Sequence, residues 1–216
     1  METTLNYISI LGSFVLAISG ALTAMSKRFD PFGVLIVAFA TAVGGGTVRD
    51  MLLSGKSAFW LEQTSYIHFI LAGTIFAIVF KSRLFHINRP LLFFDAIGLA
   101  LYTVTGVQIG LQYELASVNC VILGTITGVF GGILRDILVN EVPVIFKKEV
   151  YATVCILGSI LYLLLHRIQL PTVILQTVPV LFIIILRLLV IQFNISLPSL
   201  YADEREARRN NKKLEN

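Results

Sequence analysis

Three consecutive glycines, Gly44, Gly45 and Gly46, lie in an apolar stretch and are followed within one helical turn by a charged pair. Glycine has no side chain to shield the backbone and reaches φ > 0 without strain. An interrupted helix exposes carbonyl groups that can replace water around a small cation, and N–H groups that attract anions. The pattern predicts a broken transmembrane helix along a polar path. The alternative is that these glycines only let helices pack closely.

The same motif recurs 86 residues further along the chain. Residues 43–53 align with residues 129–139, and six of these eleven positions are identical. Gly131 and Gly132 therefore repeat the last two glycines of the first motif, while Phe130 takes the place of its first glycine. We expect Gly131 and Gly132 to form a second helix break in the same path.

Each glycine motif ends in an Arg-Asp pair, Arg49-Asp50 in the first copy and Arg135-Asp136 in the second. Adjacent residues on a helix do not face each other, so each charge is free to pair with another helix. Charges within a membrane are costly enough to suggest function. Two readings stay open for both pairs: a structural ion pair near the interface, or a gate.

Further polar candidates lie on two other apolar stretches. Asp95 either attracts cations to an entrance or interacts with the positive end of its own helix. Ser19 and Thr105 occupy matching positions in the two copies and are candidates for the remaining pore wall, unless they bond back to their own backbone.

A basic pair without a counterpart in the first copy precedes the sixth apolar stretch. Lys147-Lys148-Glu149 is either a solvated, lipid-facing charge run or a group whose Lys reaches into the mouth of the path and regulates passage.

The elements that position these residues are apolar helices. The 216 residues are 56% hydrophobic and only 14% charged, whereas soluble domains have about 25% charged residues. The sequence therefore predicts an all-α integral membrane protein. Seven apolar segments are expected, at about 5–25, 32–53, 66–80, 91–110, 117–138, 150–165 and 172–192.

The 86-residue offset divides these segments into two copies of three plus one extra, a 3+3+1 arrangement. A unit of three helices ends on the side opposite its start, so the second copy is inverted, as in transport proteins built around two discontinuous helices. The expected divisions are repeat 1 at 1–90, repeat 2 at 91–167, a seventh span at 168–195 and a polar cytoplasmic tail at 196–216.

The distribution of basic residues predicts the orientation. Of 17 Lys and Arg residues, 13 fall on one side of the predicted spans and 3 on the other, while Arg187 lies within the last span and is expected to reach the headgroups. The positive-inside rule then places the N-terminus outside and the C-terminus in the cytoplasm of a multi-pass plasma (inner) membrane protein.

Other function classes lack sequence support. The formal charge of +4 is attributed to topology and contact with anionic lipids rather than to nucleic acid. The sequence contains no catalytic or phosphate-loop pattern, and its two cysteines have no Cys or His at metal-ligand spacing. We expect no enzyme activity, catalytic residue, metal site or cofactor beyond a permeant K⁺ or Na⁺.

Taken together, these motifs resemble the prokaryotic branch of the trimeric intracellular cation (TRIC) channel family, over about residues 5–192. The resemblance implies a homotrimer with an hourglass pore in each protomer, permeable to K⁺ and other monovalent cations. It also implies bends at the glycines of both motifs and a role of Lys148 in pore function. Phe130 and the lack of basic residues in the fourth span depart from the family pattern.

Two alternatives to a passive channel remain. Relatives of this three-helix repeat have been labelled transporters of small amino acids, which suggests a secondary transporter for a zwitterion such as glycine. A membrane scaffold whose glycines only pack helices is the third possibility.

Overall fold

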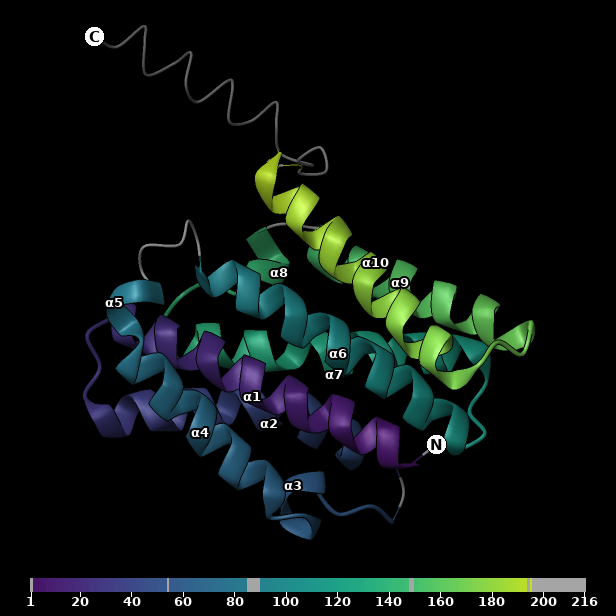
Figure 1. The fold of residues 1–216 in the computed structure, drawn as a ribbon, viewed down its shortest axis with the longest axis horizontal. Helices are drawn as coiled ribbons and strands as arrows, with labels where there is room; N and C mark the ends of the chain where they lie inside the picture. The colour runs from purple at the N-terminus through teal and green to yellow at the C-terminus, as the bar shows by residue number, and fades with distance from the viewer. Residues whose placement is uncertain (1, 54, 85–89, 148–149, 194, 196–216) are drawn as a thin grey trace, which may run out of the picture.

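The structure is a computed structural model that describes the whole chain except residues 1, 54, 85–89, 148–149, 194 and 196–216. The described residues form helices and no strands (Figure 1). The helices are α1 Glu2–Ser26, α2 Pro31–Leu52, α3 Phe59–Glu62, α4 Ser65–Val79, α5 Lys81–Leu84, α6 Pro90–Gln112, α7 Ser117–Leu138, α8 Val144–Lys147, α9 Val150–Arg167 and α10 Thr172–Gln192.

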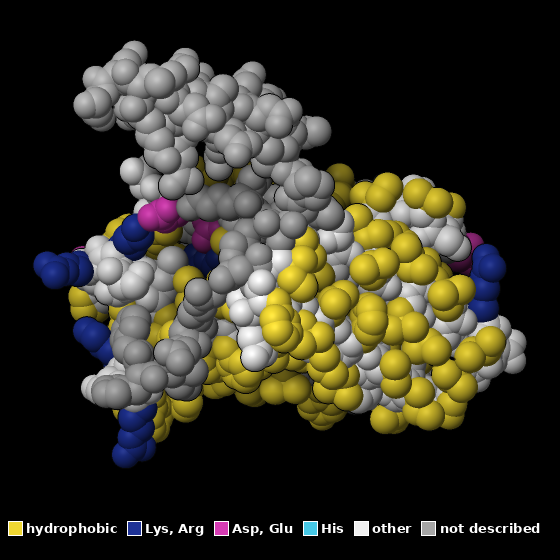
Figure 2. Space-filling model, turned by 90° about the horizontal axis from the view of Figure 1, so that it is seen from above, with side chains coloured by type: hydrophobic (Ala, Val, Ile, Leu, Met, Phe, Trp, Pro, Cys, Tyr) yellow, Lys and Arg dark blue, Asp and Glu magenta, His cyan; other side chains and the backbone are white. Residues whose placement is uncertain are grey.

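The prediction of an all-helical membrane protein is confirmed. Six of the described helices, α1, α2, α6, α7, α9 and α10, are long and apolar enough to cross a bilayer. The remaining apolar segment, the third in the chain at 66–80, forms α4, which has 15 residues and is therefore about 22 Å long, shorter than a hydrocarbon core of about 30 Å. Apolar side chains cover the middle of the molecule and Lys and Arg lie at its ends (Figure 2), as expected for a surface that contacts lipid.

Helix contacts follow the predicted repeat. In the first half α1 packs on α2 and α4, and in the second half α6 packs on α7 and α9. Each half has its own buried apolar cluster, one built mainly from α1, α2 and α4 and the other from α6, α7, α9 and α10. The halves meet through α1 against α6 and α2 against α7, and α10 packs on α9 and α6. The inverted 3+3+1 arrangement and its residue boundaries stay predictions.

The backbone conformations after the helices also repeat. Arg28 and Glu114, 86 residues apart, have φ of 61° and 54° just after α1 and α6. Gly55 and Asn140, 85 residues apart, have φ of 74° and 58° after α2 and α7. A left-handed residue commonly closes a helix end. The two halves thus end corresponding helices in the same way, with one residue of slippage.

The predicted helix breaks are wrong. Helix α2 runs without interruption through Gly44, Gly45 and Gly46, and α7 runs through Gly131 and Gly132. Each glycine weakens a helix by only about 1 kcal/mol relative to alanine, whereas open backbone groups within a bilayer cost several kcal/mol each. Helical hydrogen bonding is therefore retained, and the missing side chains serve another purpose.

Candidate functional site

Helices α2 and α7 touch at two glycines, and the two contacts are equivalent under the 86-residue offset. A side chain on Gly45 would overlap the carbonyl oxygen of Thr127, and a side chain on Gly131 would overlap the carbonyl oxygen of Thr41. Both threonine hydroxyls donate to their own helix, each at 2.6 Å. We call this contact the glycine crossing; it brings the backbones of the two halves together without intervening side chains.

The remaining motif glycines lie against side chains. A Cβ on Gly44 would meet Leu134, one on Gly46 the ring of Phe59, and one on Gly132 the hydroxyl of Tyr151. Of the motif glycines, therefore, Gly45 and Gly131 form the direct backbone contact between α2 and α7.

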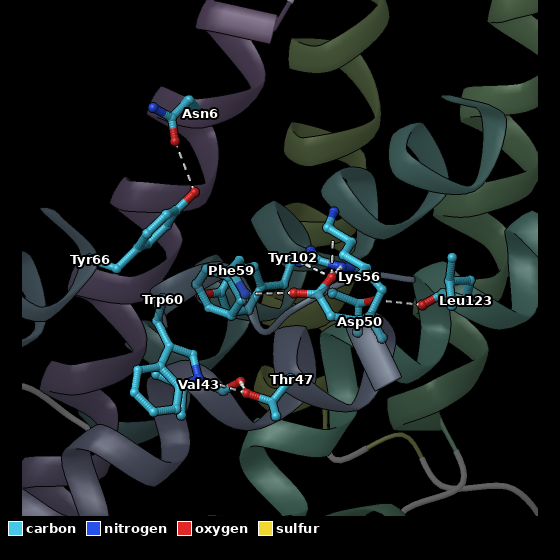
Figure 3. Close-up of polar contacts among 12 residues, drawn as sticks. Asn6, Val43, Thr47, Asp50, Lys56, Phe59, Trp60, Tyr66, Tyr102 and Leu123 are labelled. Atoms are coloured by element: carbon cyan, nitrogen blue, oxygen red, sulfur yellow. Dashed lines mark hydrogen bonds and ion pairs between the residues drawn. The ribbon is translucent and has the colours of Figure 1, made fainter. Parts of the chain in front are cut away.

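A group of charged and aromatic side chains lies at the end of the bundle where α2 ends. We call it the Arg49 cluster; it consists of Arg49 and of Asp50, Lys56 and Phe59, which Figure 3 labels. The Arg49 guanidinium donates through Nε and Nη2 to Asp50 Oδ1, both at 2.8 Å. The other oxygen of Asp50 accepts the Phe59 backbone N–H at 2.8 Å, and Lys56 Nζ lies 3.6 Å from Oδ1. Arg49 also lies over the Phe59 ring, 5.4 Å from its centroid. The carboxylate thereby ties α3 to the end of α2.

The corresponding group, which we call the Arg135 cluster, lies at the opposite end, where α7 ends. It consists of Arg135, Asp136, Asp95 and Ser19. Arg135 donates through Nε to Asp136 Oδ1 at 2.9 Å. Its Nη1 donates to Asp95 Oδ1 at 2.6 Å and to Ser19 Oγ at 2.9 Å. Asp136 Oδ2 accepts the Val144 backbone N–H at 3.0 Å. Here the carboxylate ties α8 to the end of α7, as Asp50 ties α3.

The structure thus selects between some of the predicted roles. Each Arg pairs with the Asp beside it, and among the described ion pairs only Arg135 also joins a carboxylate on another helix. Asp95 is 1% exposed and ion-paired, so it is neither an open entrance charge nor a simple helix-end charge. Thr105 bonds back to the Leu101 carbonyl at 2.8 Å.

A cavity of about 540 Å³ opens beside the Arg49 cluster. It is lined by the charged residues Arg49, Lys56 and Glu62 and by uncharged residues from α1, α3, α4, α6 and the link between α3 and α4, namely Leu5, Asn6, Ser9, Phe59, Gln63, Tyr66, Ile109 and Gln112. The Tyr66 hydroxyl donates to Asn6 Oδ1 at 2.9 Å across one wall (Figure 3). The sequence did not single out Ser9, Lys56 or Tyr66 as site residues; comparing the two copies position by position is the signal that finds them.

Two further predictions concern cytoplasmic charges. Lys147 ends α8, but its side chain and all of Lys148 and Glu149 lie outside the described residues. Arg187 does not reach the headgroups as predicted: it is 1% exposed and its guanidinium lies 4.4 Å from the centroid of the Tyr151 ring. Because α10 packs on α9, Arg187 makes a cation–π contact with the Tyr151 ring instead of the predicted contact with lipid headgroups.

Comparison with known proteins identifies relatives along most of the chain. A family model described as "Glycine transporter" matches residues 6–82 and 92–167. A UPF0126 membrane protein of Vibrio cholerae is 42% identical over 166 residues, 75% of this chain and 69% of the relative. The UPF0126 inner membrane protein YadS of Escherichia coli K12 is 36% identical over 200 residues, 92% of this chain and 97% of the relative.

Solved structures of TRIC channels share the fold. The TRIC orthologue of Rhodobacter sphaeroides is 31% identical, with a TM-score of 0.82 over 89% of this chain and 100% of its own. A second structure, described in work on conductance through TRIC cation channels, is 34% identical, with a TM-score of 0.78 over 90% of this chain and 96% of its own. The resemblance drawn from the sequence is confirmed: the chain belongs to the family of UPF0126 membrane proteins matched by the glycine-transporter model, and this family is related to the prokaryotic TRIC cation channels.

Proposed function

We propose that this chain is a passive channel for monovalent cations, K⁺ among them, and that it acts as a homotrimer with one path in each protomer. The observation that carries the proposal is the glycine crossing, in a fold shared with solved cation channels. The path runs between α2 and α7, and α1 and α6 complete its wall. The Arg49 end faces outside and the Arg135 end faces the cytoplasm.

The crossing then acts as the constriction of the path. In this structure Gly45 and Gly131 each lie against a carbonyl oxygen of the other helix. A path between α2 and α7 requires these backbones to separate, which would leave the carbonyls of Thr41 and Thr127 facing the passing ion. Carbonyl oxygens are the ligands that replace water around K⁺ in selective channels. In the proposed mechanism this conformation is the closed one: the two backbones touch at the crossing, and the cavity at the Arg49 end is not lined by Gly45 or Gly131.

Single-channel recording in planar bilayers with a K⁺ gradient tests the proposal. The wild-type chain gives unitary current steps that reverse near the K⁺ equilibrium potential. Gly45→Leu and Gly131→Leu each abolish or strongly reduce the unitary current, because a branched side chain fills the constriction. Trimer formation is measured in parallel by size-exclusion chromatography.

Gly73→Ala is the matched control. A side chain on Gly73 of α4 would lie against the Phe14 carbonyl oxygen of α1, so this is a glycine contact of similar tightness outside the crossing. Trimers of this variant retain the wild-type unitary current. Unchanged current in Gly45→Leu trimers would refute the pore role of the crossing.

A second function, a carrier for a small zwitterion such as glycine, is favoured by the description of the matching family model and by a cavity with charges of both signs. A carrier gives saturable uptake of labelled glycine into proteoliposomes without unitary currents. A scaffold gives neither signal, so one pair of measurements separates the three classes.

A further inference from the structure

The two Arg clusters are built on the same plan but hold different numbers of carboxylates. Arg135 is bound by Asp136 on its own helix and by Asp95 on α6. Position 95 corresponds, by the 86-residue offset, to position 9, where the first copy has a serine. Among the described residues, Asp50 is the one carboxylate within ion-pair distance of Arg49.

The third partner of Arg135, the Ser19 hydroxyl, also has no counterpart at the other end. Ser19 accepts a hydrogen bond from Arg135 Nη1 at 2.9 Å. Its counterpart 86 residues on, Thr105, donates its hydroxyl proton to the Leu101 carbonyl of its own helix instead. Among the described contacts, Arg49 therefore has no counterpart of the Asp95 and Ser19 acceptors of Arg135.

A cavity lies where these acceptors would be. Ser9 and Arg49 both line the cavity of about 540 Å³ at the Arg49 end. A serine side chain is shorter than an aspartate side chain and carries no charge. Where the second copy has a carboxylate, the first copy has a serine and room beside it.

The charge balance points the same way. In the Arg49 cluster two cations, Arg49 and Lys56, share the single carboxylate of Asp50. In the Arg135 cluster one cation is shared by two carboxylates. Glu62 also lines the cavity, but no ion pair joins it to Arg49 or Lys56 among the described contacts. One carboxylate thus serves two cations at the Arg49 end, and the cavity leaves room beside Arg49 and Lys56 for a second one.

From this we infer that the cavity at the Arg49 end binds a small solute bearing a carboxylate, which takes the place at Arg49 and Lys56 that the Asp95 carboxylate takes at Arg135. Nε and Nη2 of Arg49 already bind Asp50, so Arg49 Nη1 and the Lys56 ammonium would supply the charge-assisted hydrogen bonds, which are the strong ones for carboxylates. Ser9, Asn6 and Gln112 supply polar contacts around the solute. The site deepens the second function proposed above, a carrier for a small zwitterion, because it assigns the residues that hold the carboxylate; binding itself needs no flux through the protein.

Trp60 provides a direct measure of binding. It is the only tryptophan of the sequence, it follows the cavity residue Phe59 on α3, and its Nε1 donates to Thr47 Oγ1 at 3.1 Å. The purified chain is titrated in detergent with acetate and with glycine at constant ionic strength set by chloride. Both carboxylates are expected to shift Trp60 emission saturably and to raise the unfolding temperature, because a ligand that binds only the folded state stabilises it. Methylammonium, which lacks a carboxylate, has neither effect.

Two variants at position 9 form the matched pair. Ser9→Asp supplies a tethered carboxylate to Arg49, so it raises the unfolding temperature without ligand and abolishes the response to acetate. Ser9→Asn has a similar size and no charge, and it keeps the response. Lys56→Gln, on a loop outside the helices, weakens acetate binding roughly tenfold, the equivalent of about 1.4 kcal/mol.

Three results would overturn the inference: no saturable response to acetate or glycine in the wild-type chain, an equal response to methylammonium, or an undiminished acetate response in folded Ser9→Asp and Lys56→Gln. Because binding is measured without current, a chain that fails to conduct still tests this site. A chain that conducts but ignores carboxylates rejects the site and leaves the channel intact.

Discussion

The two ends of the bundle carry the same Arg-Asp motif, yet one end is filled by the protein itself and the other is open. At the Arg135 end the guanidinium is enclosed by Asp136, Asp95 and Ser19. At the Arg49 end the guanidinium has one carboxylate and faces a cavity. In both clusters the Asp carboxylate accepts a backbone N–H from the short helix that follows, which is a structural role. The two clusters differ in the second carboxylate and in the cavity, and these are the features on which the proposed carboxylate site rests.

Between the ends the halves are alike. The glycine crossing uses corresponding residues, Gly45 against Thr127 and Gly131 against Thr41. The contacts of the two halves are thus equivalent at mid-length, where each half contributes one glycine and one threonine. They differ at the two ends, where the Arg residues have different partners.

The largest expected effect comes from removing the carboxylate that distinguishes the ends. Asp95→Asn leaves Arg135, 1% exposed, with one carboxylate in place of two. Breaking a buried ion pair by removing one partner destabilises by about 3–5 kcal/mol. Denaturant or thermal unfolding in detergent measures the loss.

Ser9→Ala is the control at the corresponding position of the Arg49 end, and it costs less than about 1 kcal/mol because no charge loses a partner. Equal losses in Asp95→Asn and Ser9→Ala would show that the ends do not differ in the way their contacts indicate.

A smaller, matched pair of effects is expected at the glycine crossing. Gly45→Ala and Gly131→Ala each place a methyl group on a carbonyl oxygen of the facing helix, and such overpacking costs about 1–3 kcal/mol. The two losses in unfolding free energy agree closely, because the contacts are equivalent. A clear inequality would mean that the asymmetry of the ends extends to the middle of the bundle.

The sequence was sufficient to predict the helices and the repeat. Long apolar segments specify membrane helices by length and composition alone, and the 86-residue offset aligned Arg49-Asp50 with Arg135-Asp136 before any contact was known. The helical membrane fold and the two Arg-Asp pairs could therefore be predicted from the sequence.

What the sequence did not reveal depends on partners far along the chain. Glycine runs suggest a break in isolation, but the carbonyl of Thr127 that fills the space above Gly45 is 82 residues away. The pairing of Asp95 with Arg135 joins residues 40 apart that no spacing rule connects. Arg187 was expected at the headgroups because the sequence does not show that Tyr151 lies beneath it.

The smallest effect on stability is expected from the contacts that the loops after α2 and α7 make with the other half of the chain. At the Arg135 end Glu141 pairs with Lys27 at 2.5 Å, with side chains 43% and 40% exposed. Offsets of 85 and 86 relate these residues to Lys56 and Tyr113, where Lys56 lies 5.7 Å from the centroid of the Tyr113 ring. The same loop contact is thus an ion pair at one end and a cation–π contact at the other.

Salt distinguishes the two loop contacts. Lys27→Ala costs about 0.2–1 kcal/mol at low ionic strength, and the loss shrinks as salt is added because an exposed pair is screened. Tyr113→Leu at the other end removes about 0.5–1 kcal/mol of cation–π attraction and keeps most of the apolar bulk. Unfolding of both variants at low and high KCl measures the difference. If Lys27→Ala lost as much unfolding free energy as Asp95→Asn, at low and high salt alike, Glu141 would belong to the buried Arg135 cluster. The contrast between a filled end and an open end would then include the loops as well.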